Sequence, residues 1–283
     1  MVRSAIILAR QSLFKSNPKE KHMAKFSIEV RFMGGLNAAQ QAAFSNAAKR
    51  WGQVVVGDFP SVTVDGEVIH ALVIEASGKN IDGAGSILGQ SSPTHLLPNG
   101  LPCKGFMEFD TADLAEMEAD GTLGSVILHE MGHVLGIGSI WTEMHDLVGS
   151  KSANPRFVGS QADAEWVKLS GLAPKSLPVE NKGGPGTRNA HWRENVFGNE
   201  LMTGFLSGAT QPLSRMTIAS LADLGYKVNF DAADPFSLPS HLELRAMGVG
   251  ADPDLVRRCT LSSKRTTSFT PKRLSNEALA AHN

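Results

Sequence analysis

The first clear pattern of apolar and polar positions begins near Phe26. Apolar and polar residues alternate over residues 26–32, which predicts a half-buried strand that ends at two glycines. Residues 36–54 place apolar side chains three and four apart behind an N-cap at Asn37, and this spacing predicts an amphipathic helix. The face of this helix expected to be buried carries Ala39, Ala42, Ala43, Ala47 and Trp51.

Further strands and helices follow before the middle of the chain. Apolar runs at residues 68–74, 83–90 and 105–109 predict three more strands, the second of them interrupted by glycines. Helical spacing predicts a short helix at residues 110–119 and a longer one at residues 123–135. Strands and helices mixed on this scale indicate an α+β fold.

The second half of the chain is less regular. Residues 137–190 are rich in Gly, Ser, Pro and Asn, and they predict a long, mostly irregular insert with one helical stretch near residues 162–169. Irregular stretches of this length are uncommon unless they serve a function. A last clear helix is expected at residues 214–224, with Ser214 as its cap and Gly225 at its end.

These patterns divide the chain into four parts. Residues 23–136 and 137–238 form the body, and residues 239–283 are expected to form a largely solvated C-terminal extension. Residues 1–22 are expected to form a disordered N-terminal extension, upstream of an alternative start at Met23. The apolar run in this first part is too short for a secretory signal, and an organelle transit peptide is the other alternative.

Composition and charge narrow the class of protein. The chain has 283 residues, 42% of them hydrophobic, which is enough to form a sizeable core. The two ends of the chain, residues 1–22 and 251–283, together hold 11 of the 27 basic and 4 of the 28 acidic side chains. Residues 23–250 therefore keep 16 basic and 24 acidic side chains, a net charge of −8. An acidic body argues against nucleic acid as the main partner.

No apolar run reaches the length of a membrane span. Cys103 and Cys259 lack the spacing of a metal or redox motif, and whether they pair is open.

The most informative run is His129-Glu130-Met131-Gly132-His133, on the helix expected at residues 123–135. Two histidines four residues apart share one face of a helix, and zinc sites use this spacing with the adjacent glutamate as general base. A catalytic zinc ion takes three protein ligands and leaves one position for water, so a third ligand is needed. The alternative is a chance match, which the apolar residues before the motif disfavour.

The third ligand is not assigned by spacing alone. The compact pattern HExxHxxGxxH would place a third histidine at position 139, three residues after the glycine. This chain has Ser139 there, and serine is a poor zinc ligand. His191 lies 58 residues beyond His133, and a place on a surface loop is the alternative interpretation for it. The candidates nearer in sequence are Glu143, His145 and Asp146.

Two stretches of sequence, with the gap between them, resemble a known family. HEMGHVLGIGSIW, a long insert and then HWRENVFGNELMTG resemble the leishmanolysin family of metzincin zinc endopeptidases, in particular its short bacterial-type members. In that family a large insertion displaces the third histidine, and a methionine turn follows it. The resemblance implies that His129, His133 and His191 bind one zinc ion. It also implies that Glu130 is the general base and that Met202 forms the apolar floor beneath the imidazoles, although methionine is also ordinary core filler.

The same resemblance implies a fold and a mode of substrate binding. The fold is that of a metzincin-like zincin in two lobes. The upper lobe, residues 23–136, holds a twisted mixed sheet, a backing helix and the active-site helix, and the irregular lower lobe, residues 137–238, holds the methionine turn and a closing helix. Residues 204–212 are implied to line the pocket for the side chain after the scissile bond. Substrates are implied to add as a strand to an edge strand, which chain order places at Ser86, Ile87, Leu88 and Gly89.

The expected function is that of a zinc-dependent endopeptidase that acts as a monomer on peptides or proteins. Two other classes stay open: an inactive metal-binding or adhesion module of the same fold, and a zinc hydrolase of non-peptide amides or esters. The intact Glu130 disfavours the first, and the methionine turn disfavours the second. Calcium binding stays open, because the sequence shows no recognisable set of calcium ligands. The resemblance implies a secreted or cell-surface protein, while the lack of a recognisable signal peptide leaves cytoplasmic and organellar locations open.

Overall fold

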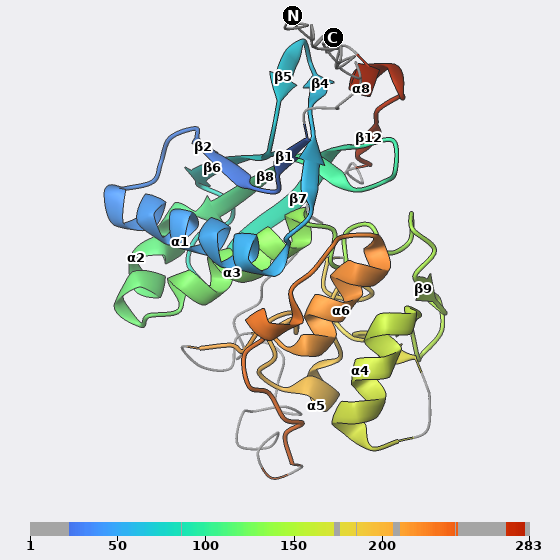
Figure 1. Ribbon diagram of the computed structural model, residues 1–283. Coiled ribbons are helices and arrows are strands. Elements are labelled where there is room, and N and C mark those ends of the chain that lie inside the picture. Colours follow the sequence, from blue (N-terminus) through green and yellow to red (C-terminus); the bar gives the residue numbers. More distant parts are fainter. Residues whose placement is uncertain are drawn as a thin grey trace, which may run out of the picture.

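A twisted five-stranded sheet forms the upper part of the molecule in Figure 1. The structure is a computed structural model that describes residues 23–85, 87–172, 176–184, 186–205, 210–240, 242 and 270–280. The order of the sheet is β12-β7-β8-β6-β2, in which β2, β6 and β8 are parallel neighbours and β7 is antiparallel to β8. The strands are β2 (Ile28–Phe32), β6 (Leu72–Lys79), β7 (Gly89–Leu96), β8 (Pro102–Asp110) and β12 (Lys272–Arg273). The α+β class expected from the sequence is therefore observed.

Helix α1 (Ala38–Val54) starts where the sequence predicts it. The side chain of Asn37 accepts a hydrogen bond from Gln40 N, and the side chain of Gln40 accepts one from Asn37 N, which together form a capping box. The buried face differs from the expected one, because Ala39 and Ala42 are exposed and the large ring of Phe44 is buried instead. The buried positions are Gln40, Phe44, Ala47, Trp51 and Val54.

Helix α3 (Leu123–Val134) packs against α1 and against the sheet. The indole Nε1 of Trp51 donates a hydrogen bond to Leu128 O at 3.0 Å. A Cβ at Gly105 of β8 would lie 2.5 Å from Val134 Cγ1, so the glycine lets the helix approach the strand closely. Helix α2 (Thr111–Ala119), capped by the side chain of Asp110, leads from the sheet towards α3. The predicted helices at residues 110–119 and 123–135 are both confirmed.

The strand expected at residues 83–90 starts later than predicted. It is β7, which begins at Gly89 and extends to Leu96. Pro93 and the polar residues around it conceal the strand pattern, but proline is tolerated where a strand lacks a partner on one side, and β12 pairs only with His95 and Leu96 of β7. The predicted strands at residues 26–32 and 105–109 correspond to β2 and β8.

Shorter strands surround the main sheet. The strand expected at residues 68–74 is divided between β5 and β6 by a turn at His70 and Ala71. A small antiparallel sheet, β11-β10-β9, lies within the long insert. The remaining strands are β1 (Met23–Lys25), β3 (Asp58–Pro60), β4 (Val62–Val64), β5 (Glu67–Ile69), β9 (Leu147–Val148), β10 (Arg156–Phe157) and β11 (Leu177–Pro178).

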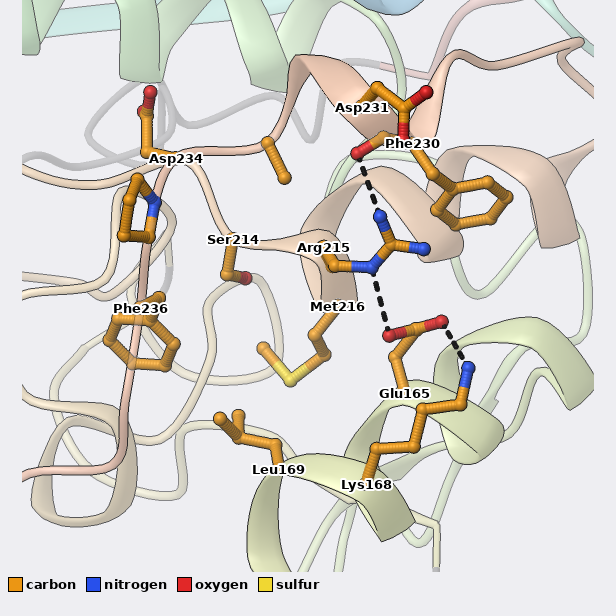
Figure 2. Close-up of a pocket in the computed structure, with 12 residues that line it drawn as sticks. Glu165, Lys168, Leu169, Ser214, Arg215, Met216, Phe230, Asp231, Asp234 and Phe236 are labelled. Atoms are coloured by element: carbon orange, nitrogen blue, oxygen red, sulfur yellow. Dashed lines mark hydrogen bonds and ion pairs between the residues drawn. The ribbon is translucent and has the colours of Figure 1, made fainter.

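Helices α4, α5 and α6 gather below α3 in Figure 1. Their bounds are Ser160–Ser170, Glu194–Phe197 and Arg215–Leu224. A pocket of about 610 Å³ lies between α4, α6 and the segment around the short 3-10 helix η1 (Phe230–Ala232) (Figure 2). One side of this pocket is fixed by Glu165, which pairs with Lys168 at 2.8 Å and with Arg215 at 3.3 Å.

The end of the described chain returns to the sheet. Strand β12 pairs with His95 and Leu96 of β7, and helix α8 (Glu277–Ala280) follows it. Pro271 is buried, whereas Lys272, Arg273 and residues 275–277 are exposed, and the solvated C-terminal extension stays a prediction. The expected extension at residues 1–22 and Cys259 lie outside the described residues, whereas Cys103 is buried as a free thiol. In the described part of the chain, no helix is long and apolar enough for a membrane crossing.

Candidate metal centre

Three histidine side chains converge next to helix α3. His129 and His133 lie one turn apart on this helix, and His191 comes from the loop before α5. The Nε2 atoms of His129 and His133 are 2.9 Å apart, and each lies 3.1 Å from Nε2 of His191. All three side chains are buried. Among the described residues they form one group with the spacing of metal ligands, which does not include Glu143, His145 or Asp146.

The other nitrogen of each ring is held by a backbone carbonyl. A carbonyl oxygen can only accept a hydrogen bond, so each Nδ1 carries the ring proton and each Nε2 turns a lone pair towards the other two. Ligand histidines are usually oriented in this way. The Nδ1 atoms donate to Leu201 O from His129 at 2.6 Å, to Ile137 O from His133 at 2.7 Å and to Thr187 O from His191 at 3.0 Å.

Burial keeps these rings neutral. It lowers the pKa of His129 to about 4 and that of His191 to about 3, and it places the pKa of His133 well below its usual range. At neutral pH three unprotonated nitrogens therefore face one another with no proton to share. Three nitrogens spaced in this way can all lie ~2.0–2.1 Å from one ion, the length of a zinc–imidazole bond. The donor set therefore fits a zinc ion.

The chain leaves α3 directly after the second histidine. Gly136 has a φ of +111°, a conformation that favours glycine, and the helix ends there as the sequence predicts. The hydroxyl of Ser139 donates to His133 O at 2.6 Å. Where the compact zinc pattern has its third histidine, this chain therefore has a side chain that caps the helix.

Gly138 brings this loop against the segment that carries the third histidine. Its φ is +75°, and a Cβ there would lie 1.9 Å from the carbonyl oxygen of Ala190. No side chain fits at this contact. The close approach of the two backbones sets the position of His191 relative to the end of α3.

The turn around Met202 is fixed by a buried carboxylate. Glu200 is fully buried and accepts hydrogen bonds from Met202 N at 2.7 Å and from Ser214 Oγ at 2.6 Å, as well as from Ser214 N and Thr217 Oγ1. Burial raises the pKa of Glu200, and these four donors oppose that rise. The carboxylate thus joins the turn to the start of α6, and it fixes Leu201, whose carbonyl orients His129.

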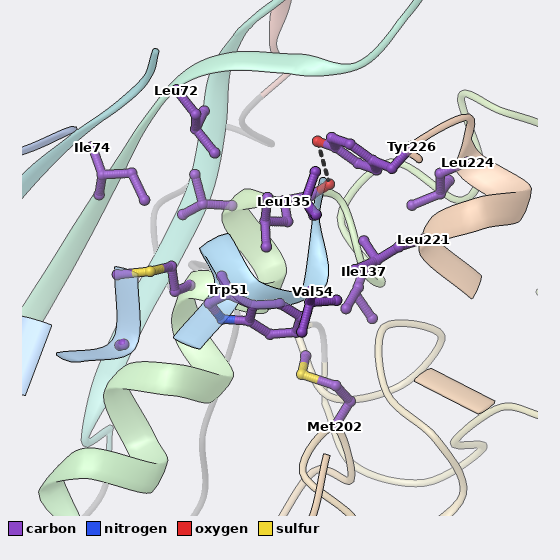
Figure 3. Close-up of a cluster of buried hydrophobic side chains, with 14 of the residues drawn as sticks. Trp51, Val54, Leu72, Ile74, Leu135, Ile137, Met202, Leu221, Leu224 and Tyr226 are labelled. Atoms are coloured by element: carbon purple, nitrogen blue, oxygen red, sulfur yellow. Dashed lines mark hydrogen bonds between the residues drawn. The ribbon is translucent and has the colours of Figure 1, made fainter. Parts of the chain in front are cut away.

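Met202 packs against Gly132 of the motif helix and lies beneath Trp51 in Figure 3. Its side chain is buried, and a Cβ at Gly132 would lie 2.8 Å from its sulfur atom and 3.2 Å from Trp51. The glycine inside the histidine motif therefore provides the space that Met202 and Trp51 fill. The sequence did not indicate this role for Gly132.

Glu130 lies beside the histidines and is fully buried. Its Oε2 atom accepts a hydrogen bond from Ser91 Oγ at 2.7 Å. Ser91 belongs to β7 and was missed by sequence reasoning, because a lone serine in an unrecognised strand carries no signal. A correct prediction of strand β7 would have placed Ser91 beside the motif helix.

The residues expected to bind substrate lie at the start of β7. Ser86 is outside the described residues, Ile87 and Leu88 precede the strand, and Gly89 is its first residue. In the expected pocket segment, residues 204–212, the structure describes residues 204–205 and 210–212. The substrate roles of both segments stay predictions.

Comparison with known proteins agrees with this geometry. The leishmanolysin model of peptidase family M8 matches residues 71–241, more than half of the chain. The chain belongs to the leishmanolysin family. A leishmanolysin-like peptidase of Drosophila pseudoobscura pseudoobscura is 39% identical over 86 residues, which are 29% of this chain and 12% of that protein. The family is one of zinc-dependent metallopeptidases, and this member spans a small part of the length of that relative.

Two buried carboxyl groups lie on the segments around His191 in this leishmanolysin-family chain. Glu180 accepts backbone hydrogen bonds from Asn181, Lys182 and Glu194. Burial, and then the nearby charge of Glu180, raise the pKa of Glu194 to about 8. Glu194 is therefore protonated at neutral pH.

Gly138→Ala is expected to weaken zinc binding by roughly 10–100-fold, the range for altered ligand support, because the new methyl group would displace Ala190 and with it His191. Zinc affinity measured by competition with a chelator checks this. The matched control is Gly124→Ala on α3, where an added Cβ meets nothing within 4 Å beyond its chain neighbours and its own helix backbone. Wild-type affinity in the Gly138 variant would contradict the role given to this contact.

Glu194→Gln is expected to remove a pH dependence of stability. In the unfolded chain this carboxyl ionises near pH 4.5, whereas in the folded protein it keeps its proton up to about pH 8. The wild-type free energy of unfolding therefore falls between these pH values, by roughly a few kcal/mol, and glutamine has no proton to lose. Thermal unfolding at pH 6 and 8.5 should show a smaller difference in Tm for the variant, while Glu143→Gln, at an exposed position, keeps the wild-type difference. An unchanged difference in the Glu194 variant would contradict the assignment.

Proposed function

We propose that the protein is a zinc-dependent endopeptidase. The observation that carries the proposal is the convergence of three Nε2 lone pairs beside a buried glutamate on the same helix. His129 and His133 supply two ligands from α3, and His191 supplies the third. Membership of the leishmanolysin family supports the same chemistry.

The chain's own residues hold the metal and move a proton. A zinc ion bound here would polarise the scissile carbonyl and lower the pKa of a bound water towards ~7. Glu130 follows His129 directly, so the helix holds its carboxylate next to the metal ligands. In the proposed reaction Glu130 takes the proton of the attacking water and passes it to the leaving amine, as a general base and then a general acid. The hydrogen-bonded Nδ1 atoms keep the three rings in place during this transfer.

The edge of β7 is the proposed binding strand for the substrate backbone. Strand β8 lies on one side of β7, and on the other side the described residues pair only with His95 and Leu96, through β12. On that side residues 89–94 have no strand partner among the described residues, although Gly89, Gln90, Ser91 and Pro93 are buried, so an added strand would have to displace what covers them. Ser91 in this stretch contacts Glu130, so a peptide paired here would pass the base.

Glu130→Gln should abolish peptide cleavage while zinc stays bound. Glutamine keeps the size of the side chain and removes its basicity, a loss of roughly 10²–10⁴-fold or more in kcat. Cleavage of a broad peptide library, together with zinc content by elemental analysis, checks this. The control is Glu116→Gln at an exposed position on α2, which should keep wild-type activity.

The outcomes of this experiment separate the candidate functions. Full activity in the Glu130 variant would overturn the role of Glu130 as base. A wild-type protein that binds zinc and cleaves no peptide would be a metal-binding module. Cleavage confined to small amides or esters would indicate a non-peptide hydrolase.

His191→Ala is expected to lower the bound zinc from about one ion per chain to a small fraction, because two imidazoles remain where a catalytic site needs three ligands. The measurement is metal content after dialysis against a weak chelator. His145→Ala is the matched control, because His145 is exposed and was the nearest histidine candidate in the sequence. Equal zinc content in the His191 variant and the wild type would show that another group completes the site.

A further inference from the structure

Ser91 makes two close contacts with the same residue of the motif helix. Its Oγ lies 2.7 Å from Glu130 Oε2 and 2.8 Å from Glu130 O, and the side chain is fully buried. Both distances are in the range of O–H···O hydrogen bonds. A serine on the candidate substrate strand is thus joined to both the side chain and the backbone of the candidate base.

The strand geometry explains why Ser91 faces the helix. Ser91 pairs in register with Met107 of β8, and Pro93 pairs with Gly105. Alternate residues of a strand share a face, and Gly105 lies directly against Val134 of α3. The face that carries Ser91 is therefore the one that packs on the motif helix.

The two contacts hold the hydroxyl of Ser91 between the side chain and the backbone of Glu130. A serine hydroxyl has one proton to donate and two lone pairs to accept with. A carboxylate oxygen is a stronger acceptor than a backbone carbonyl, so the hydroxyl donates to Oε2 while it stays beside Glu130 O. The carboxyl group is thereby tied to a fixed point on the neighbouring strand.

We propose that Ser91 is a positioning residue that holds the Glu130 carboxyl group in one orientation beside the three histidines. The inference rests on the function proposed above, in which Glu130 is the base. Since Ser91 contacts Glu130 and no histidine ligand in the described hydrogen bonds, it acts on proton transfer and leaves metal binding unchanged.

Ser91→Ala should lower kcat by roughly 10–100-fold, the range for residues that orient a catalytic group, with KM within about threefold and zinc content unchanged. The matched control is Ser45→Ala on α1, away from the proposed site, where the exposed hydroxyl bonds to Gln41 O of its own helix. Ser91→Thr keeps a hydroxyl and should recover much of the lost kcat. A purely structural role would lower the unfolding temperature and leave the kcat of the folded fraction unchanged.

Ser91→Cys keeps the side-chain volume and weakens the donor, so it tests the inference even if the alanine variant does not fold. It should also lower kcat at normal zinc content. Wild-type kcat in a folded Ser91→Ala or Ser91→Cys protein would overturn the inference. The proposed function fails separately, by full activity of Glu130→Gln, so an inactive Glu130→Gln beside a fully active Ser91→Ala would remove only the role of Ser91.

Discussion

The site depends on the three hydrogen bonds that fix the imidazole rings through Nδ1. Each bond ends on a carbonyl from a different segment: Leu201 in the methionine turn, Ile137 after α3, and Thr187 before the third histidine. Without these bonds the rings could turn, and the three lone pairs would not meet. Since buried lone pairs that face one another are unfavourable without a cation, metal binding and the folding of these segments are expected to be coupled.

The groups that place these carbonyls do not themselves face the histidines. Glu200 holds the methionine turn on the start of α6 through four donors, and Gly138 brings the end of the motif loop to the backbone of Ala190. Ser139 caps the carbonyl of His133. Gly138, Ser139 and Thr187 of the insert are therefore held by specific contacts beside the three histidines.

Sequence reasoning succeeded where the folding signal is local. The cap at Asn37 and the spacing of His129 and His133 depend on neighbours within one or two helical turns, and both were located correctly. The predicted position of β7 was wrong because Pro93 and its polar neighbours conceal the alternating pattern, and proline is accepted there since β12 pairs only with His95 and Leu96. The predicted buried face of α1 differs from the observed one, because burial of the Phe44 ring stabilises the fold more than burial of several alanines. No local rule brings His191 back across 58 residues, and only the family resemblance pointed to it.

The two halves of the site are thus specified in different ways. Helix geometry alone places two of the proposed ligands and the proposed base, because one turn of α3 holds all three. The proposed third ligand, Met202 and Ser91 lie on the segment before α5, the turn before α6 and strand β7, and each is placed by tertiary contacts. Such contacts can be altered without changing the motif. The recognisable five residues therefore fix the kind of chemistry, while the surrounding contacts decide how precisely the groups meet.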